Sequence, residues 1–196
     1  MARKVKNSEA LLTDLWRQAT DCSDEGNEAE AYKHILRVLE LDSHNPVVHY
    51  NLGCSAEYLG KHRLAGEHFT DAIDLDPSYA DAYFMRAVSY DHLKRHDLAV
   101  KDCAKALDIN PDDAMTYNNR GISHCWSGNA RQAMRDYNKS IRLDPNVARF
   151  YFNRGMLSEK MRNWDRAASD FQTAIGIDPN HAGSLARLKL LKAGKC

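Results

Sequence analysis

The sequence predicts an all-α protein built from one repeated helix-turn-helix unit, and three series of residues at a constant spacing support this. Small residues recur every 34 positions, at Ala19, Gly53, Ala87, Gly121 and Gly155. Alanines recur in the same phase, at Ala31, Ala65, Ala99, Ala133 and Ala167. Prolines follow at Pro77, Pro111, Pro145 and Pro179, with Ser43 in the first position of that series. Small residues at a fixed period mark close helix crossings, and a period of about 20–50 residues is typical of a stacked repeat.

These series divide the chain into repeats that can be justified in order. Residues 1–11 are predicted to be a lead-in, with Ser8 as the N-cap of a helix whose first turn runs from Glu9 to Leu11. Five repeats follow, at 12–45, 46–79, 80–113, 114–147 and 148–181. Residues 182–196 carry an apolar stripe of Leu185, Leu188 and Leu191 among basic residues. We expect them to form a capping helix that covers the last repeat, rather than a basic helix that seeks a membrane or a partner.

Each repeat is predicted to hold two helices joined by a tight turn. Gly26, Gly60 and Gly128 occupy the turn, where a helix end favours the left-handed conformation, and Lys94 and Arg162 stand there in the third and fifth repeats. The second helix is clearest in 97–109, where apolar residues follow a helical period up to Asn110 and its proline. Asn45 is expected to cap the next helix in the second repeat, and Asp112 or Asp113 in the fourth.

Composition favours a reduced compartment and disfavours several classes of partner. Lysine and arginine total 27, as do aspartate and glutamate, so the net charge is zero, which argues against nucleic-acid and anionic-membrane surfaces. The five cysteines are odd in number and form no CxxC pair, which is typical of reduced thiols in a cytoplasmic protein. We also expect no secretory signal and no membrane insertion, because no apolar run is long enough.

The residues that carry the period resemble those of the tetratricopeptide repeat, a 34-residue helix-turn-helix with Gly or Ala, Ala, Ala and Pro at these offsets. The resemblance covers residues 12–181. Ser43 departs from the proline series, and Val38 and Ser140 depart from a further alanine series at Ala72, Ala106 and Ala174. It implies a right-handed α-solenoid whose first helices line a concave groove. It also implies that the groove binds a protein or peptide.

The resemblance places a set of side chains in that groove. They are Trp16, Arg17, Tyr50, Asn51, Phe84, Val88, Asn118, Asn119, Ile122, Trp126, Arg149, Phe152, Asn153 and Met156. Asn51, Asn119 and Asn153 form a ladder, interrupted by Met85, similar to the asparagine ladder of the O-GlcNAc transferase repeats. An amide can bond both the N–H and the C=O of an extended peptide. The aromatic residues have two open interpretations, since they either contact the ligand or pack between helices.

Two charged patterns bear on the kind of ligand. Repeats that dock the acidic C-termini of heat-shock chaperones need Lys and Asn, then Asn, then Lys and Arg on three successive first helices. No window of this chain has more than two plausible members, and Asp81 would repel a carboxylate, so no clamp is predicted. Arg86, Arg120 and Arg154 also stand one period apart. They either bind a phosphate or an acidic peptide, or form a solvated, salt-bridged face, which mixed charges nearby favour.

Catalysis is not expected, because the sequence lacks a glycine-rich phosphate loop and a nucleophile pair. His124 and Cys125 are adjacent, so they point about 100° apart on a helix. His92 and His96 straddle a turn without a completing ligand, so no metal or cofactor is predicted. The sequence therefore predicts a non-catalytic module or scaffold that binds a peptide or helix. The alternatives are a regulatory or substrate-recruiting segment of a larger enzyme or complex, and a self-associating scaffold.

Overall fold

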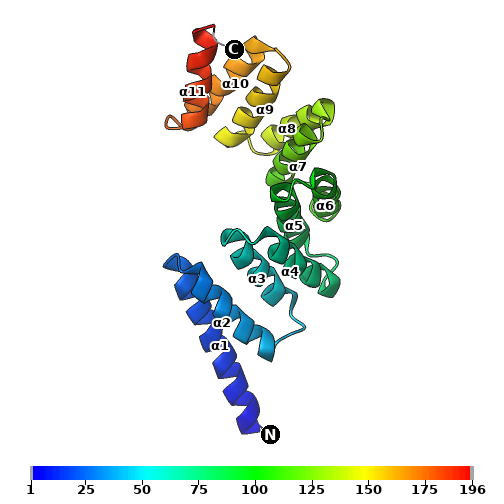
Figure 1. Cartoon of the computed structure of the whole chain (residues 1–196), viewed down its shortest axis with the longest axis vertical. Coiled ribbons are helices and arrows are strands. Elements are labelled where there is room, and N and C mark those ends of the chain that lie inside the picture. The colour runs from blue at the N-terminus through cyan, green and yellow to red at the C-terminus, as the bar shows by residue number, and fades with distance from the viewer. Residues whose placement is uncertain (1, 195–196) are drawn as a thin grey trace. The chain divides into compact units, whose positions relative to one another are not determined.

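The structure, a computed structural model, describes residues 2–194, with side chains from Glu9 onward. Eleven α-helices and no strand occur in this part of the chain, which confirms the all-α prediction (Figure 1). The helices are α1 (Ala2–Asp24), α2 (Glu28–Leu41), α3 (Pro46–Tyr58), α4 (His62–Leu75), α5 (Ala80–His92), α6 (His96–Ile109), α7 (Ala114–Trp126), α8 (Ala130–Leu143), α9 (Ala148–Lys160), α10 (Trp164–Ile177) and α11 (Ala182–Lys192). Within residues 2–194, no helix has both the length and the apolarity of a membrane span.

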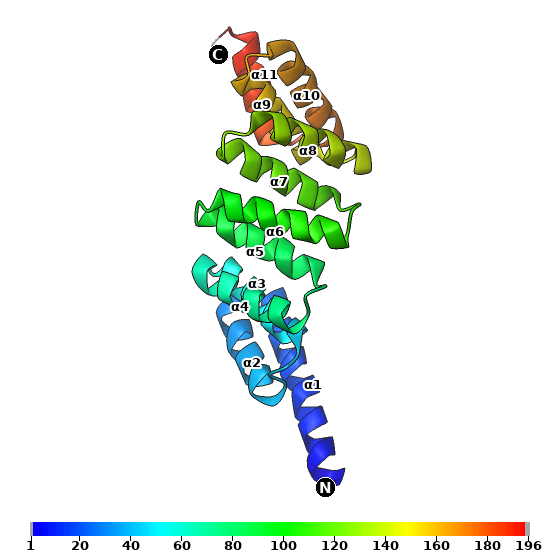
Figure 2. The same ribbon diagram turned by 90° about the vertical axis from the view of Figure 1, so that its right-hand side faces the viewer.

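The chain divides after Arg95 into two compact units. In the N-terminal unit, α1 packs on α2, α3 on α4, and α5 contacts both α3 and α4. In the C-terminal unit, α7 packs on α8, α9 packs on α10, and α11 contacts α10; Figure 2 labels these helices. Direct contacts between α3 and α5, and between α7 and α9, make the first helices of successive repeats neighbours within each unit.

The first helix begins earlier than the sequence predicts. α1 starts at Ala2 and continues through Ser8, so the prediction that Ser8 caps the first turn is wrong. The physical reason is that residues 2–12 contain no glycine or proline to stop a helix, and several of them are strong helix formers.

The turns inside the repeats have the predicted left-handed residue. Gly26, Gly60 and Gly128 have φ of 74°, 71° and 79°, and Lys94 and Arg162 adopt 58° and 60° at the same place. In the second repeat the N–H of Lys61 bonds the carbonyl of Ala56 at 2.8 Å, and the N–H of Gly60 bonds that of Glu57 at 2.9 Å. This pair of bonds satisfies carbonyls that the helix end would leave open. The two non-glycine residues adopt the conformation at a cost of about 1–2 kcal/mol each.

Capping at the helix starts follows the sequence in two repeats. The side chain of Asn45 accepts a hydrogen bond from the N–H of Val47, with Pro46 at the first helical position. Asp113, one of the two predicted candidates, accepts from the N–H of Met115 in the same way. Such caps satisfy N–H groups that have no partner within the helix.

The recurring small residues lie where a second-helix side chain crosses the first helix. A Cβ built at Gly53 would come within 2.5 Å of the ring of Phe69, and one at Gly121 within 2.7 Å of the ring of Tyr137. Gly155 faces Phe171 in the same way, again at 2.7 Å. Glycine is therefore required at each of these positions, because an aromatic ring occupies the space that a Cβ would need.

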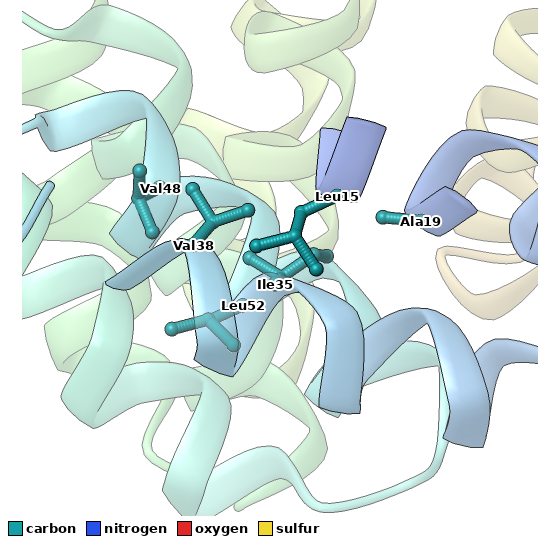
Figure 3. Packing of buried hydrophobic residues seen from close by; sticks show 6 residues of the cluster. All are labelled: Leu15, Ala19, Ile35, Val38, Val48 and Leu52. Carbon is teal, nitrogen blue, oxygen red and sulfur yellow. The ribbon is translucent and has the colours of Figure 1, made fainter. Parts of the chain in front are cut away.

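In the first repeat, smaller side chains meet where the two helices cross. Ala19 of α1 shares a buried cluster with Ile35, and this cluster continues through Leu15, Val38, Val48 and Leu52 (Figure 3). Because an aliphatic side chain takes the place of the aromatic ring, the slot has room for a Cβ. The core of the N-terminal unit thus joins α1, α2 and α3.

Candidate functional site

The predicted groove residues all lie on odd-numbered helices, and the structure places them in two separate groups. The N-terminal unit carries Trp16 and Arg17 on α1, Tyr50 and Asn51 on α3, and Phe84 and Val88 on α5. The C-terminal unit carries Asn118, Asn119, Ile122 and Trp126 on α7, and Arg149, Phe152, Asn153 and Met156 on α9. Within each group the side chains differ in how much of their surface reaches solvent.

In the N-terminal unit the aromatic members pack between helices. Trp16 packs against the buried cluster of α1, α2 and α3. The ring centroid of Tyr50 lies 5.8 Å from that of Phe69 and 5.0 Å from that of Tyr79. Burial raises the pKa of the Tyr50 hydroxyl above its ordinary value. These contacts favour a packing role for Trp16 and Tyr50.

The polar members of this group are engaged locally. Arg17 donates to the carboxylate of Asp14 at 2.5 Å. The amide of Asn51 donates to the carbonyl of Val47, one turn earlier on the same helix, at 2.7 Å. An extended peptide would have to compete with that bond for the donor of Asn51. Phe84 and Val88 are half-buried on α5.

Phe152 in the C-terminal unit belongs to a helix contact. Its ring centroid lies 5.9 Å from that of Phe171 on α10 and 5.1 Å from that of His181. A Cβ added at Gly183 would come within 2.9 Å of the Phe152 ring, so α11 approaches this side chain closely. Phe152 therefore holds α9, α10 and α11 together.

Asn118 is fully buried, at 0% exposure. Its side-chain oxygen accepts a hydrogen bond from Nδ2 of Asn153 at 2.9 Å. Asn118 therefore orients the side chain of Asn153. Of these three asparagines, Asn119 and Asn153 reach the surface, and both are half-buried.

Two of the predicted side chains on α7 and α9, Trp126 and Arg149, are exposed to solvent, and so is Met115 beside Arg149. Trp126 is 71% exposed and stacks on His96 with ring centroids 5.9 Å apart. Arg149 is exposed, and its guanidinium lies 2.8 Å from Sδ of Met115, which is itself 39% exposed. Together with Asn119 and Asn153, these three residues (Met115, Trp126 and Arg149) make up what we term the α7–α9 face. Ile122 and Met156 are half-buried on the same helices.

Two members of the arginine series, Arg120 and Arg154, are ion-paired, as the sequence favoured, but their partners are not solvated. The third member, Arg86, donates to the hydroxyl of Thr70 at 3.0 Å. Arg120 donates twice to Asp136, with both contacts at 2.8 Å, and the aspartate is only 6% exposed. Arg154 donates to Asp170 at 3.0 and 2.6 Å, and that aspartate is 3% exposed. The hydrogen bond to Asp136 raises the pKa of Arg120. These arginines brace the two helices of a repeat, so a phosphate would have to displace a buried carboxylate.

A cleft of about 390 Å³ lies between α10 and α11. Its apolar lining comes from Trp164, Ala168, Leu188 and Leu191, with Asp165 and Lys192 at the edge. The terminal helix therefore leaves part of the α10 surface accessible, which the sequence did not predict.

Two groups of histidine and carboxylate in the N-terminal unit were not predicted from the sequence. Glu57, His62 and His92 form one group, and His49, His68 and Asp71 form the other. Their members are 3 to 35 positions apart, which is no recognised ligand spacing. The available signal was that histidines replace the tyrosine and aspartate of later repeats, at positions 49 and 68.

Comparison with known proteins identifies relatives by sequence and by fold. Two family models described as tetratricopeptide repeat match the chain, one over residues 50–114 and the other over residues 148–181. No curated protein matches the sequence significantly.

Solved structures share the fold at low identity. MamA from Desulfovibrio magneticus RS-1 is 18% identical with a TM-score of 0.80, covering 87% of this chain and 97% of that chain. YrrB, described as a TPR protein with an unusual peptide-binding site, is 22% identical with a TM-score of 0.72, covering 90% and 91%. The pilF protein of Pseudomonas aeruginosa is 18% identical with a TM-score of 0.79, covering 96% and 90%.

Proposed function

The chain belongs to the tetratricopeptide repeat family, and from this premise we propose that it is a non-catalytic module that binds a peptide or helix of another protein. We assign the repeats to residues 12–45, 46–79, 80–113, 114–147 and 148–181, with 182–196 as the cap. YrrB is described as having a peptide-binding site, which supports a peptide as the ligand. The partner itself is of unknown identity, in a cytoplasmic setting.

The exposure of Trp126 carries the proposal. A tryptophan that is 71% exposed keeps most of a large apolar surface in water, even though it stacks on His96. Burying such a ring against a partner removes that apolar surface from water, which favours binding. Tryptophan and arginine are also enriched at binding hot spots. Arg149 and Met115 lie next to one another on the same two helices. We therefore place the ligand on the α7–α9 face.

Polar groups on this face would orient the ligand. Asn119 carries one acceptor and two amide hydrogens, which suits the N–H and C=O of a peptide backbone. Asn153 is held in place by its bond to the buried Asn118. Each such bond would contribute about 0.5–1.5 kcal/mol net, so Trp126 supplies most of the affinity.

The proposal excludes some partners. Arg120 and Arg154 are committed to buried aspartates, so they are not offered to phosphates of a nucleic acid. A clamp for the acidic tails of heat-shock chaperones is not proposed, because Asp81 would repel a carboxylate and Met85 takes the place of its cation. Membrane insertion is not part of the proposal either.

A peptide-display selection tests this function. Peptides retained by the native chain are measured against a variant with Asn119→Ala, Trp126→Ala and Arg149→Ala. We expect binding to fall at least tenfold, because the variant removes the apolar anchor and two polar contacts. A control variant changes exposed residues of the second helices, with Lys105→Ala, Arg131→Ala and Arg135→Ala. Equal binding by the native chain and the first variant would contradict the assignment of the site.

Self-association remains the second candidate, and the cleft between α10 and α11 is the observation that favours it. Trp164, at 39% exposure, and Leu191 line an apolar surface at the end of the repeats. A self-associating chain would show concentration-dependent mass in sedimentation. Trp164→Ser would then restore the monomer, whereas a monomeric native chain would eliminate this candidate.

A further inference from the structure

His49, His68 and Asp71 bring three potential metal ligands to one place in the N-terminal unit. His49 lies on α3, and His68 and Asp71 lie one turn apart on α4. The ligand atoms of all three fall within 4.8 Å of one another, and Nδ1 of His49 is 3.4 Å from Oδ2 of Asp71. Two imidazoles and a carboxylate are a ligand set that zinc enzymes and zinc-binding proteins use.

The other nitrogen of each ring is already engaged. Nε2 of His49 is 3.1 Å from the carbonyl oxygen of Ser43, which can only accept, so Nε2 carries the proton. In the neutral imidazole, Nδ1 then carries the lone pair, and Nδ1 lies on the side of Asp71. Nε2 of His68 is 2.9 Å from the hydroxyl of Tyr32. Metal-binding histidines are typically held by such a bond from the nitrogen that does not bind the metal.

Both Nδ1 atoms are buried and lack a hydrogen-bond partner among the described residues. A buried polar atom without a partner destabilises the fold. At His49, Nδ1 of the neutral ring faces a carboxylate oxygen of Asp71 at 3.4 Å, and a cation between the two atoms would stabilise both.

The fourth repeat has other residues at the positions that correspond to these three ligands. There Tyr117, Asp136 and Lys139 stand 68 positions after His49, His68 and Asp71. Arg120 neutralises Asp136, and both Arg120 and Lys139 lie over the Tyr117 ring, at 5.3 and 5.7 Å. In the second repeat Leu52 takes the place of the arginine. The second repeat therefore has no arginine at this position, and two imidazoles and a carboxylate stand where the fourth repeat has Tyr117, Asp136 and Lys139.

We propose that His49, His68 and Asp71 bind a zinc ion through the two Nδ1 atoms and a carboxylate oxygen. The ion supplies the positive charge that the arginine supplies in the fourth repeat. Three protein ligands leave the fourth tetrahedral position for water or for a group from a partner. The side chain of Asp71 is 55% exposed, so this position opens to solvent. Zinc would link α3 to α4 and stabilise the N-terminal unit.

The neighbouring group of Glu57, His62 and His92 does not fit a metal equally well. The two rings are stacked, with centroids 4.2 Å apart and planes 10° apart. In-plane lone pairs on parallel rings run side by side and do not converge on one ion. The carboxylate is also satisfied, because Ser89 donates to its second oxygen at 2.7 Å and His62 lies 2.9 Å from the first. This group serves as the matched control.

Calorimetric titration of the chelator-treated full chain with zinc chloride, in a non-chelating reductant, tests the proposal. We expect one zinc per chain, and at least tenfold weaker binding in His49→Gln and in His68→Gln. Tyr32→Phe keeps all ligands and should weaken binding about tenfold, because it removes the bond that orients His68. The control variant His62→Gln with His92→Gln should bind zinc like the native chain.

A second readout on the native chain keeps the test independent of variant folding. With ¹⁵N-labelled histidine, zinc should shift the Nδ1 resonances of His49 and His68 much more than their Nε2 resonances. Absence of stoichiometric binding would overturn the proposal. So would binding that survives both His49→Gln and His68→Gln, or that is lost in the control variant, since the ligands would then be the cysteines or the Glu57 group. Circular dichroism checks that each variant is folded.

Discussion

Gly53→Ala tests whether the small-residue slot is set by the aromatic ring opposite it. The new Cβ would lie 2.5, 2.7 and 2.8 Å from three atoms of the Phe69 ring, all well inside van der Waals contact. Phe69 is fully buried at 0% exposure, so the ring cannot swing into solvent. Overpacking of this kind costs about 1–3 kcal/mol, and we take the upper end. Alanine has a higher helix propensity than glycine, which contributes about 1 kcal/mol in the opposite direction. The free energy of unfolding should therefore fall by about 2 kcal/mol.

Urea unfolding followed by circular dichroism measures this loss, and Gly66→Ala is the matched control. Gly66 also lies in a helix of the N-terminal unit, but nothing stands within 4 Å of its added Cβ. Gly66→Ala should therefore stabilise the chain by about 1 kcal/mol. In a Phe69→Leu background, Gly53→Ala should become neutral or stabilising, because the aliphatic partner reproduces the pairing of Ala19 with Ile35.

Gly53→Ala being as stabilising as Gly66→Ala would contradict a slot set by the Phe69 ring, as would a Phe69→Leu background that leaves the effect unchanged. Either result would mean that the two helices separate at little cost and that the slot is not set by ring contact. An unchanged m value is needed for the comparison, because a changed one signals altered cooperativity between repeats.

Three further predictions concern the buried charges, alkaline pH and the last helix. Asp170→Ala leaves Arg154 half-buried without its bidentate partner and should cost about 3–5 kcal/mol in urea unfolding; a loss below 1 kcal/mol would show that water replaces the carboxylate. Burial raises the pKa of Cys54 to about 11 from 9.0, so the folded chain keeps the thiol protonated where the unfolded chain ionises. Stability should fall by up to about 3 kcal/mol between pH 9 and 11, and less so in Cys54→Ala, as equilibrium unfolding across that range would show. A chain ending at residue 181 loses the cover of α11 over Phe152 and should be less stable by about 2 kcal/mol; an unchanged melting temperature would contradict that role.

Much of the fold could be predicted from local signals. The left-handed turns at Gly60 and Lys94 follow from their place after a helical period, and the cap at Asn45 follows from a residue type before Pro46. The start of α1 could not be predicted in this way, because Ser8 is a good cap only where the preceding residues leave the helix. A capping residue indicates a possible helix start, and its neighbours decide whether the helix begins there.

The site was less predictable from the sequence. Residues at equivalent positions of the repeats have similar types, but the helices around them cover them to different extents. Tyr50, Phe152 and Trp126 all fit the pattern of first-helix aromatics, yet Tyr50 and Phe152 pack between helices and Trp126 is exposed. Asn118 and Asn119 are adjacent amides, but only Asn118 is fully buried. The period shows which residues share a helix face, but not how much of that face the next helix covers.

The sequence by itself determined the repeat, its all-α character and its family, because small residues, turns and caps act within one period of the chain and recur with it. Only the tertiary structure decided which partners meet across helices, such as Gly53 with Phe69 and Arg154 with Asp170, and which histidines gather around Asp71. The physical reason is that these contacts depend on side-chain volume and burial at one crossing, where a single ring or carboxylate determines what its neighbour can be.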